Sequence, residues 1–270
     1  MPIEPLLILE LAALGLVTGF LAGLLGIGGG MIMVPFISAI LSGRGVEPGL
    51  AVKMAIATSM ATIIFTSVSS VRAHHKKGAV RWDIVKALAP GIVLGAMVAS
   101  LGVFALLKGA SLYFVFAAFV AFSGSQMFLD KKPSPTRQLP GTAGLLGAGG
   151  VIGALSGLVG AGGGFVSVPF MTWCNVKVQN AIGTSAAIGL PIAIAGTVGY
   201  LVNGWGASGT PPLTLGYIYL PALVLVSGVS MFFAPLGAKL AHRLPVATLK
   251  KVFAGVLMLL CAKMLHSLFG

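Results

Sequence analysis

Eight long apolar segments make up most of this 270-residue chain, and they narrow the folds open to it. Short polar or Gly/Pro-rich stretches separate these segments, which lie at about residues 6–41, 51–71, 83–107, 111–129, 143–174, 180–202, 212–238 and 246–268. A helix that crosses a bilayer needs about 20 mostly apolar residues, whereas a barrel strand needs about 10 residues of alternating polarity. The pattern therefore predicts an all-α polytopic membrane protein.

The scarcity of charge excludes a soluble fold. Only 8% of the residues are charged and 57% are hydrophobic. A soluble domain carries about 25% charged residues, because its surface must be solvated by water. Most of the surface of this chain must instead face a lipid bilayer.

The charge that is present is strongly basic, with 17 Lys and Arg against 5 Asp and Glu, a net charge of +12. In a soluble chain this balance would suggest nucleic-acid binding. In a membrane protein, cationic residues in short loops keep those loops on the cytoplasmic side. We therefore expect a multi-pass membrane protein with cytoplasmic basic loops and no nucleic-acid partner.

Two stretches of the chain repeat each other. Residues 19–36 align with residues 153–170 at an offset of 134, with 11 of 18 positions identical. Residues 55–59 match residues 181–185 at an offset of 126, and the motifs occur in the same order in both halves. Gly and Leu are common here, but a shared Gly-x-Gly-Gly-Gly followed by Val-Pro-Phe indicates a duplication rather than biased composition. We expect a first repeat at 1–129, a cytoplasmic linker at 130–142 and a second repeat at 143–270.

The basic loops occupy non-equivalent places in the two halves. In the first half, loop 72–81 is basic and the next loop carries only Lys108. In the second half, loop 203–211 has no charge, and the basic residues that follow are Lys239, Arg243, Lys250 and Lys251. Equivalent loops thus prefer opposite sides of the membrane, which predicts two inverted-topology repeats. Each repeat would contain one Gly-broken segment that enters and returns on its own side, plus three spanning helices.

Two glycine triplets interrupt the long segments and are the first candidate substrate-binding residues: Gly28, Gly29, Gly30, Gly162, Gly163 and Gly164. A helix that breaks at glycines leaves backbone N–H groups unpaired. Such groups are tolerated within a membrane only against protein or a wet cavity, and they favour an anion. Close helix packing through small residues is the alternative. Pro35 and Pro169 follow the paired breaks, which favours a binding site.

Hydroxyl side chains near the start of the next segments are the second group of candidates: Thr58, Ser59, Thr184 and Ser185. Each could bond a substrate oxygen or only a carbonyl of its own helix. A stripe of further hydroxyls is expected in the bundle interior, at Thr62, Thr66, Ser67, Ser69 and Ser70. Lys53 could line a path for anions, although its place near a segment start also suits a side chain that reaches for the interface.

The positions of the acidic residues indicate the charge of the solute. Glu4, Glu10, Glu47, Asp83 and Asp130 all lie near segment ends. Cation pumps and proton relays commonly use a carboxylate inside the membrane, so this distribution favours an anionic or neutral solute. His74 and His75 are interpreted as part of a basic loop. The chain has no pattern typical of a catalytic centre, and we expect neither an enzyme nor a metal or organic cofactor.

These motifs together resemble the TauE/SafE family of sulfite exporters. The resemblance rests on residues 26–30 followed by Val34-Pro35, on residues 160–164 followed by Val168-Pro169, on the Thr-Ser pairs, and on Leu-Gly-Ala at 94–96 and 236–238. It covers essentially the whole chain. It implies secondary transport of sulfite, a sulfonate or a related small sulfur anion across the inner membrane, with a proton as candidate coupling ion. A channel-like facilitator of small organic or inorganic anions is the alternative, and the oligomeric state stays open.

Overall fold

The computed structural model describes residues 4–26, 28–107, 109–129 and 137–241, together with 254, 255, 258, 259 and 262. Within this part, six helical stretches are long and apolar enough to cross a membrane. They are α1 (Pro5–Leu25), α3 (Pro48–His75), α7 (Thr142–Val159), α9 (Val178–Asn203), α10 (Leu220–Ala241) and the stretch Trp82–Leu106, made of α4 (Trp82–Met97), the π-helix η1 (Val98–Val103) and α5 (Phe104–Leu106). The remaining helices are α2 (Gly30–Ser42), α6 (Gly109–Leu129) and α8 (Gly164–Trp173). The chain is a multi-pass, almost entirely helical membrane protein.

The two long segments break where their glycines predict. Gly26 and Gly160 directly follow α1 and α7, and Gly29 and Gly163 directly precede α2 and α8. All four glycines have positive φ, between 67° and 79°. Residues with a Cβ rarely adopt this left-handed conformation, so the glycines are what allow the chain to turn here.

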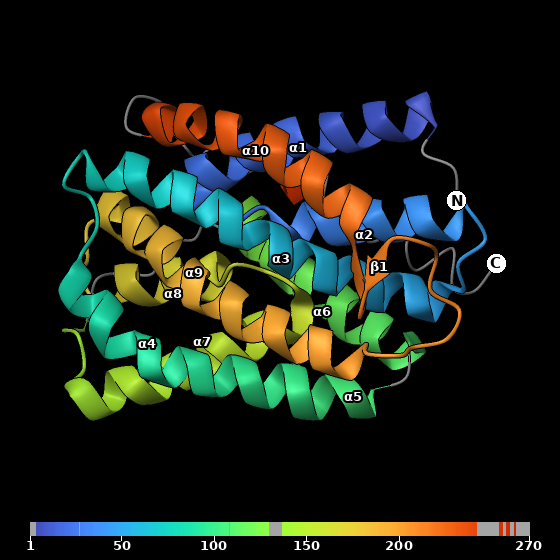
Figure 1. Ribbon diagram of the computed structural model, residues 1–270. Coiled ribbons are helices and arrows are strands. Elements are labelled where there is room, and N and C mark those ends of the chain that lie inside the picture. The colour runs from blue at the N-terminus through green and yellow to red at the C-terminus, as the bar shows by residue number, and fades with distance from the viewer. Residues whose placement is uncertain are drawn as a thin grey trace.

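The breaks are not central in their segments. The sequence predicts that each broken segment enters the membrane and returns on its own side, through two arms that turn out to be unequal in length. Helices α1 and α7, with 21 and 18 residues, are themselves long and apolar enough to span, whereas α2 and α8 have 13 and 10 residues. In Figure 1, α1 starts and α2 ends at one end of the bundle, while α7 starts and α8 ends at the other.

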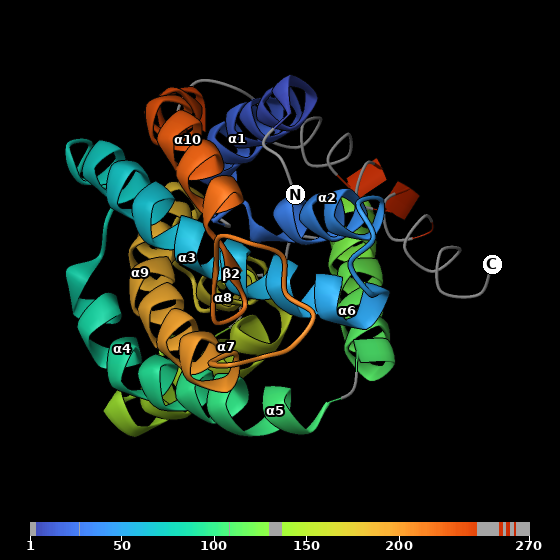
Figure 2. The same cartoon turned by 45° about the vertical axis from the view of Figure 1, so that its right-hand side comes forward.

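Helices α3 and α9 form the centre of the bundle. The share of each apolar stretch that is buried is 72% for α3 and 61% for α9, against 33–44% for the other four. Figure 2 shows α1 with α10 on one side of this central pair, and α4 with α7 on the other. Large apolar side chains such as Leu94, Val224 and Phe232 point outward, as expected for surfaces that face lipid.

Glycines allow the outer helices to approach their partners closely. A Cβ added at Gly23 of α1 would lie 1.8 Å from the carbonyl oxygen of Ala234 in α10. One added at Gly95 of α4 would lie 2.0 Å from the carbonyl oxygen of Gly150 in α7. Packing through small residues is the usual way for membrane helices to associate.

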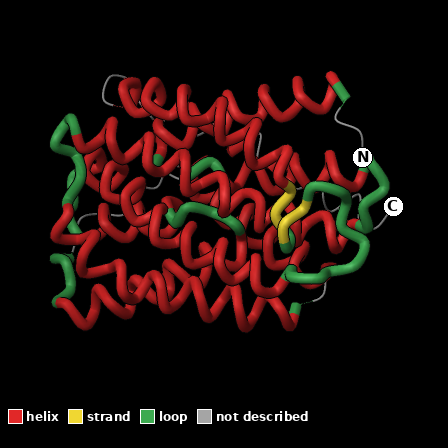
Figure 3. Tube along the Cα trace, in the orientation of Figure 1, coloured by secondary structure: helices red, strands yellow, loops and turns green. Residues whose placement is uncertain are grey.

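The segment predicted at 212–238 does not begin as a helix. Strand β1 (Thr214–Leu215) pairs antiparallel with β2 (Ile218–Tyr219), and α10 starts only at Leu220. The Pro211-Pro212 pair disfavours helix at this point, and Gly216 has a φ of 59° that suits the turn. This 214–219 hairpin lies at one end of the bundle, shown in yellow in Figure 3. Most of the predicted segment at 246–268 and most of the predicted linker lie outside the described residues.

The two ends of the bundle differ in charge. Figure 1 places the starts of α1, α3 and α10 and the end of α2 at the hairpin end, and the described charged residues in or beside these element ends are Glu4, Glu10, Arg44, Glu47 and Lys53. The starts of α4, α7 and α9 and the ends of α3 and α10 lie at the opposite end, and the described charged residues in or beside them are Arg72, Lys76, Lys77, Arg81, Asp83, Lys86, Arg137, Lys177 and Lys239. We call this second end the basic end.

Candidate functional site

The two glycine breaks touch each other in the interior of the bundle. A Cβ added at Gly28 would lie 3.0 Å from the Cα of Gly162, and one added at Gly30 would lie 2.0 Å from the carbonyl oxygen of Gly160. Side chains at these positions would push the breaks apart. The glycines therefore allow close backbone contact between the two halves of the chain.

Two serine hydroxyls tie each central helix to the break of the other half. Ser59 of α3 donates to the carbonyl oxygen of Gly160, and Ser185 of α9 donates to that of Gly26, both at 2.8 Å. Ser167 of α8 also donates to the Ser185 oxygen at 2.9 Å. The carbonyl groups at the ends of α1 and α7 have lost their helical partners, so these hydroxyls satisfy them.

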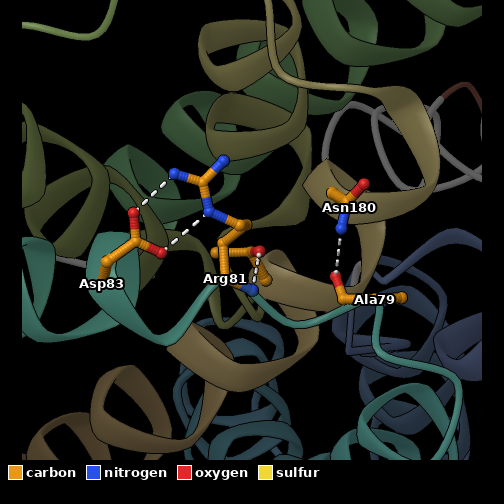
Figure 4. Close-up of polar contacts among 5 residues, drawn as sticks. Ala79, Arg81, Asp83 and Asn180 are labelled. Carbon is orange, nitrogen blue, oxygen red and sulfur yellow. Dashed lines mark hydrogen bonds and ion pairs between the residues drawn. The ribbon is translucent and has the colours of Figure 1, made fainter.

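The neighbouring threonines hold the start of two outer helices. The Thr58 hydroxyl oxygen accepts from the backbone N–H of Tyr219, just before α10, at 3.0 Å. The Thr184 oxygen accepts from the backbone N–H of Arg81, just before α4, also at 3.0 Å. Figure 4 shows this contact beside a second one, in which the Asn180 amide donates to the Ala79 carbonyl oxygen at 3.3 Å. All four predicted hydroxyls are thus bonded to the backbone in this arrangement.

The predicted hydroxyl stripe does lie in the interior. Thr62, Thr66, Ser67 and Ser70 are buried along α3. Ser69 is half-buried and donates to the carbonyl oxygen of Met231 in α10. At the offset of 126, the α9 counterparts of the four buried residues are Ile188, Ile192, Ala193 and Gly196. The polar stripe therefore belongs to one half only.

Part of this stripe lines a small recess next to the first glycine break. Its lining residues are Ala22, Gly28, Thr66, Ser67, Ser70 and Ala186, and it is too narrow to hold a water molecule. The Ser70 hydroxyl is buried there without a hydrogen-bond partner among the described residues. The sequence indicated that Ser67 and Ser70 are interior, but their position beside Gly28 depends on how α1, α3 and α9 meet.

His74 is not part of a loop, which corrects the sequence interpretation. Helix α3 continues to His75, beyond the expected end at 71, and His74 in its last turn is fully buried. Its Nε2 lies 2.9 Å from the carbonyl oxygen of Gly23 in α1. His75 is exposed, as a loop residue would be, and its Nδ1 accepts from the Trp82 indole N–H at 3.1 Å.

In the part of the chain that the structure describes, the ion pairs lie at the two ends of the bundle and not at the breaks. The ion pairs there join Glu10 to Arg44 at the hairpin end and Arg81 to Asp83 at the basic end. Among these residues no group of three His, Cys, Asp or Glu side chains could hold a metal ion. Burial raises the pKa of the Tyr219 phenol above its ordinary value.

Comparison with known proteins connects this arrangement to one family. The family model described as sulfite exporter TauE/SafE matches residues 11–264. A probable membrane transporter protein of Haemophilus influenzae is 38% identical over 252 residues, covering 93% of this chain and 95% of the relative. A second one from Methanocaldococcus jannaschii is 26% identical, covering 94% of each chain. No solved structure matches significantly.

Proposed function

Because the chain belongs to the TauE/SafE sulfite exporter family and is a membrane transporter, we propose that it is a secondary transporter that binds a small sulfur-containing anion at the paired glycine breaks. The substrate class is sulfite, a sulfonate or a related oxyanion. The family description and the name of the Haemophilus relative support the transport function. The geometry of the site supports an anionic substrate.

The observation that carries the site is the meeting of the two breaks between the most buried helices. Helices α2 and α8 start at Gly30 and Gly164, so their N-terminal N–H groups and partial positive charge lie at this junction. Neither an ammonium nor a carboxylate of the described chain lines the adjoining recess. Such a site attracts an anion by backbone dipoles and hydroxyls, and offers a cation no carboxylate.

We further propose that the halves 1–129 and 143–270, joined by a linker at 130–142, are inverted-topology repeats. Figure 1 supports this, because α1 and α7 run in opposite directions, as do α3 and α9 and also α4 and α10. In such transporters the site lies at the interface of the repeats, and the two halves rock about it to give alternating access. The tight packing at the breaks favours this mechanism over a permanently open channel.

Uptake into proteoliposomes tests the function. Purified protein should accumulate radiolabelled sulfite or a small sulfonate, and unlabelled sulfur oxyanions should compete while alkali cations should not. Protein-free liposomes are the control, and imposed pH gradients test a proton as coupling ion. Flux that follows only the electrochemical gradient of the anion would favour the channel-like facilitator. Failure to move any of these anions would overturn the proposal.

A further inference from the structure

Lys53 has an unusual environment at the hairpin end. It lies in the second turn of α3 and is only half-buried. Its ammonium stands 5.6 Å from the ring centre of Phe104 in α5 and 5.9 Å from that of Tyr217 in the 214–219 hairpin. Both ring centres therefore lie within the range of a cation–π contact with the ammonium.

This ammonium has no acidic partner among the described residues. Arg44, the other described cation at this end, forms an ion pair with Glu10 at 3.0 Å. Glu47 accepts from the backbone N–H groups of Gly49 and Leu50 at the start of α3. Aromatic faces offset only part of the cost of removing an ammonium from water. An anion bound beside Lys53 would complete its environment.

The position of Lys53 connects it to the proposed substrate site. Thr58 and Ser59, which bond Tyr219 and Gly160, follow on the same helix, and Ser59 is about 9 Å along the helix axis from Lys53. Phe104 also packs on Tyr200 of α9, with ring centres 4.5 Å apart. Lys53 therefore lies toward the hairpin end of the same helix whose hydroxyls contact the second glycine break and the hairpin.

We propose that Lys53, with Phe104 and Tyr217, forms a recruitment site for a small oxyanion at the hairpin end. The substrate binds there first and then passes to the glycine breaks. The inference rests on the proposed function, because it requires an anionic substrate. Three of the five described charges at the hairpin end are acidic, so a cation without an acidic partner would lessen their repulsion of an anion.

Charge variants separate recruitment from a purely structural role. We expect Lys53→Gln to raise the KM for uptake from the hairpin side by about five-fold at low salt, and the difference should shrink at high salt. Lys53→Arg keeps both the charge and the contact with the rings, so its KM should stay near the wild-type value. Equal KM values for Gln, Arg and wild type, in folded protein, would overturn the inference. Wild-type protein that moves no anion would instead defeat the proposed function.

Chemical modification gives a second test, in which two reagents are compared on the same variant, so that differences in folding between variants do not matter. In a background with Cys174 and Cys261 replaced by alanine, Lys53→Cys is treated with a reagent that adds an ammonium or with one that adds a sulfonate. The ammonium should restore a low KM, and the sulfonate should raise it further. Ser208→Cys, at an exposed position of the loop before the hairpin, is the matched control and should respond to neither reagent. Identical effects of both reagents at position 53 would show that only size matters there.

Discussion

Hydrogen bonds that involve four hydroxyl groups connect the two halves of this transporter. Thr58 and Thr184 accept bonds from N–H groups just before α10 and α4, and Ser59 and Ser185 donate to carbonyl groups at the breaks. Each of these bonds satisfies a backbone group. The residues proposed to contact the substrate are therefore also positioning residues in the conformation seen here.

Thr58→Val tests this double role at one residue. Valine has nearly the same shape but cannot accept the bond from the Tyr219 N–H, so we expect the free energy of unfolding to fall by about 1–3 kcal/mol. Thr58→Ser retains the hydroxyl and serves as control. Thermal unfolding in detergent measures the change, and substrate titration on the same samples measures affinity. Unchanged stability with weakened binding would mean that the hydroxyl serves only the substrate.

Gly30 offers a test of the contact between the breaks. The Cβ of Gly30→Ala would lie 2.0 Å from the Gly160 carbonyl oxygen, so the breaks must separate and both stability and transport should fall. Gly147→Ala in α7 is the matched control, since nothing lies within 4 Å of its Cβ, and alanine favours helix there. Equal transport by the two variants would contradict the contact. Unfolding and uptake measurements distinguish loss of fold from loss of function.

At the scale of elements, two short helices and a hairpin pack among the long helices. Helix α2 ends on the side where α1 starts, and α8 ends on the opposite side, where α7 starts. The 214–219 hairpin lies against the end of α9. A Cβ at Gly204, just after α9, would lie 2.3 Å from the Tyr217 backbone nitrogen, so the hairpin is packed closely. This contact, the Thr58 bond and the rings around Lys53 anchor the hairpin at three places.

The close contact at Gly204 offers a test of how firmly the hairpin is anchored. We expect Gly204→Ala to loosen the hairpin and to increase labelling of Thr214→Cys by a thiol reagent in water. The rate of labelling, compared with that of the exposed control Ser208→Cys in the same Cys-free background, measures this change. A labelling rate that is the same with and without the Gly204→Ala substitution would show that the close contact does not restrain the hairpin.

At the scale of the whole molecule, charge separates the two ends of the bundle. The basic end carries eight described cations and one acid, and the hairpin end carries two cations and three acids. The positive-inside rule therefore predicts a cytoplasmic basic end. Residues 72–81, which comprise the last turn of α3 and the loop after it, and Lys239 then face the cytoplasm although they occupy non-equivalent places in the two halves.

Labelling of single cysteines tests this orientation. In right-side-out vesicles, an impermeant thiol reagent added outside should modify Ser208→Cys and should leave Lys77→Cys unmodified until the membrane is opened. Lys77 and Ser208 are both exposed, which makes the comparison fair. Reaction of Lys77→Cys in sealed vesicles would show the opposite orientation. Lys53 would then recruit its anion from the other side of the membrane.

The sequence alone determined the class of the molecule, the position of both helix breaks and the burial of the α3 hydroxyl stripe. These follow from local properties: apolar length, the freedom of glycine to adopt positive φ, and the cost of hydroxyls in lipid. Only the tertiary structure decided that Ser59 meets Gly160, that His74 is buried, and that Lys53 stands over Phe104 and Tyr217. The partners of Ser59 and Thr58 are 101 and 161 residues away, and hydropathy contains no information on how such distant helices are placed against each other.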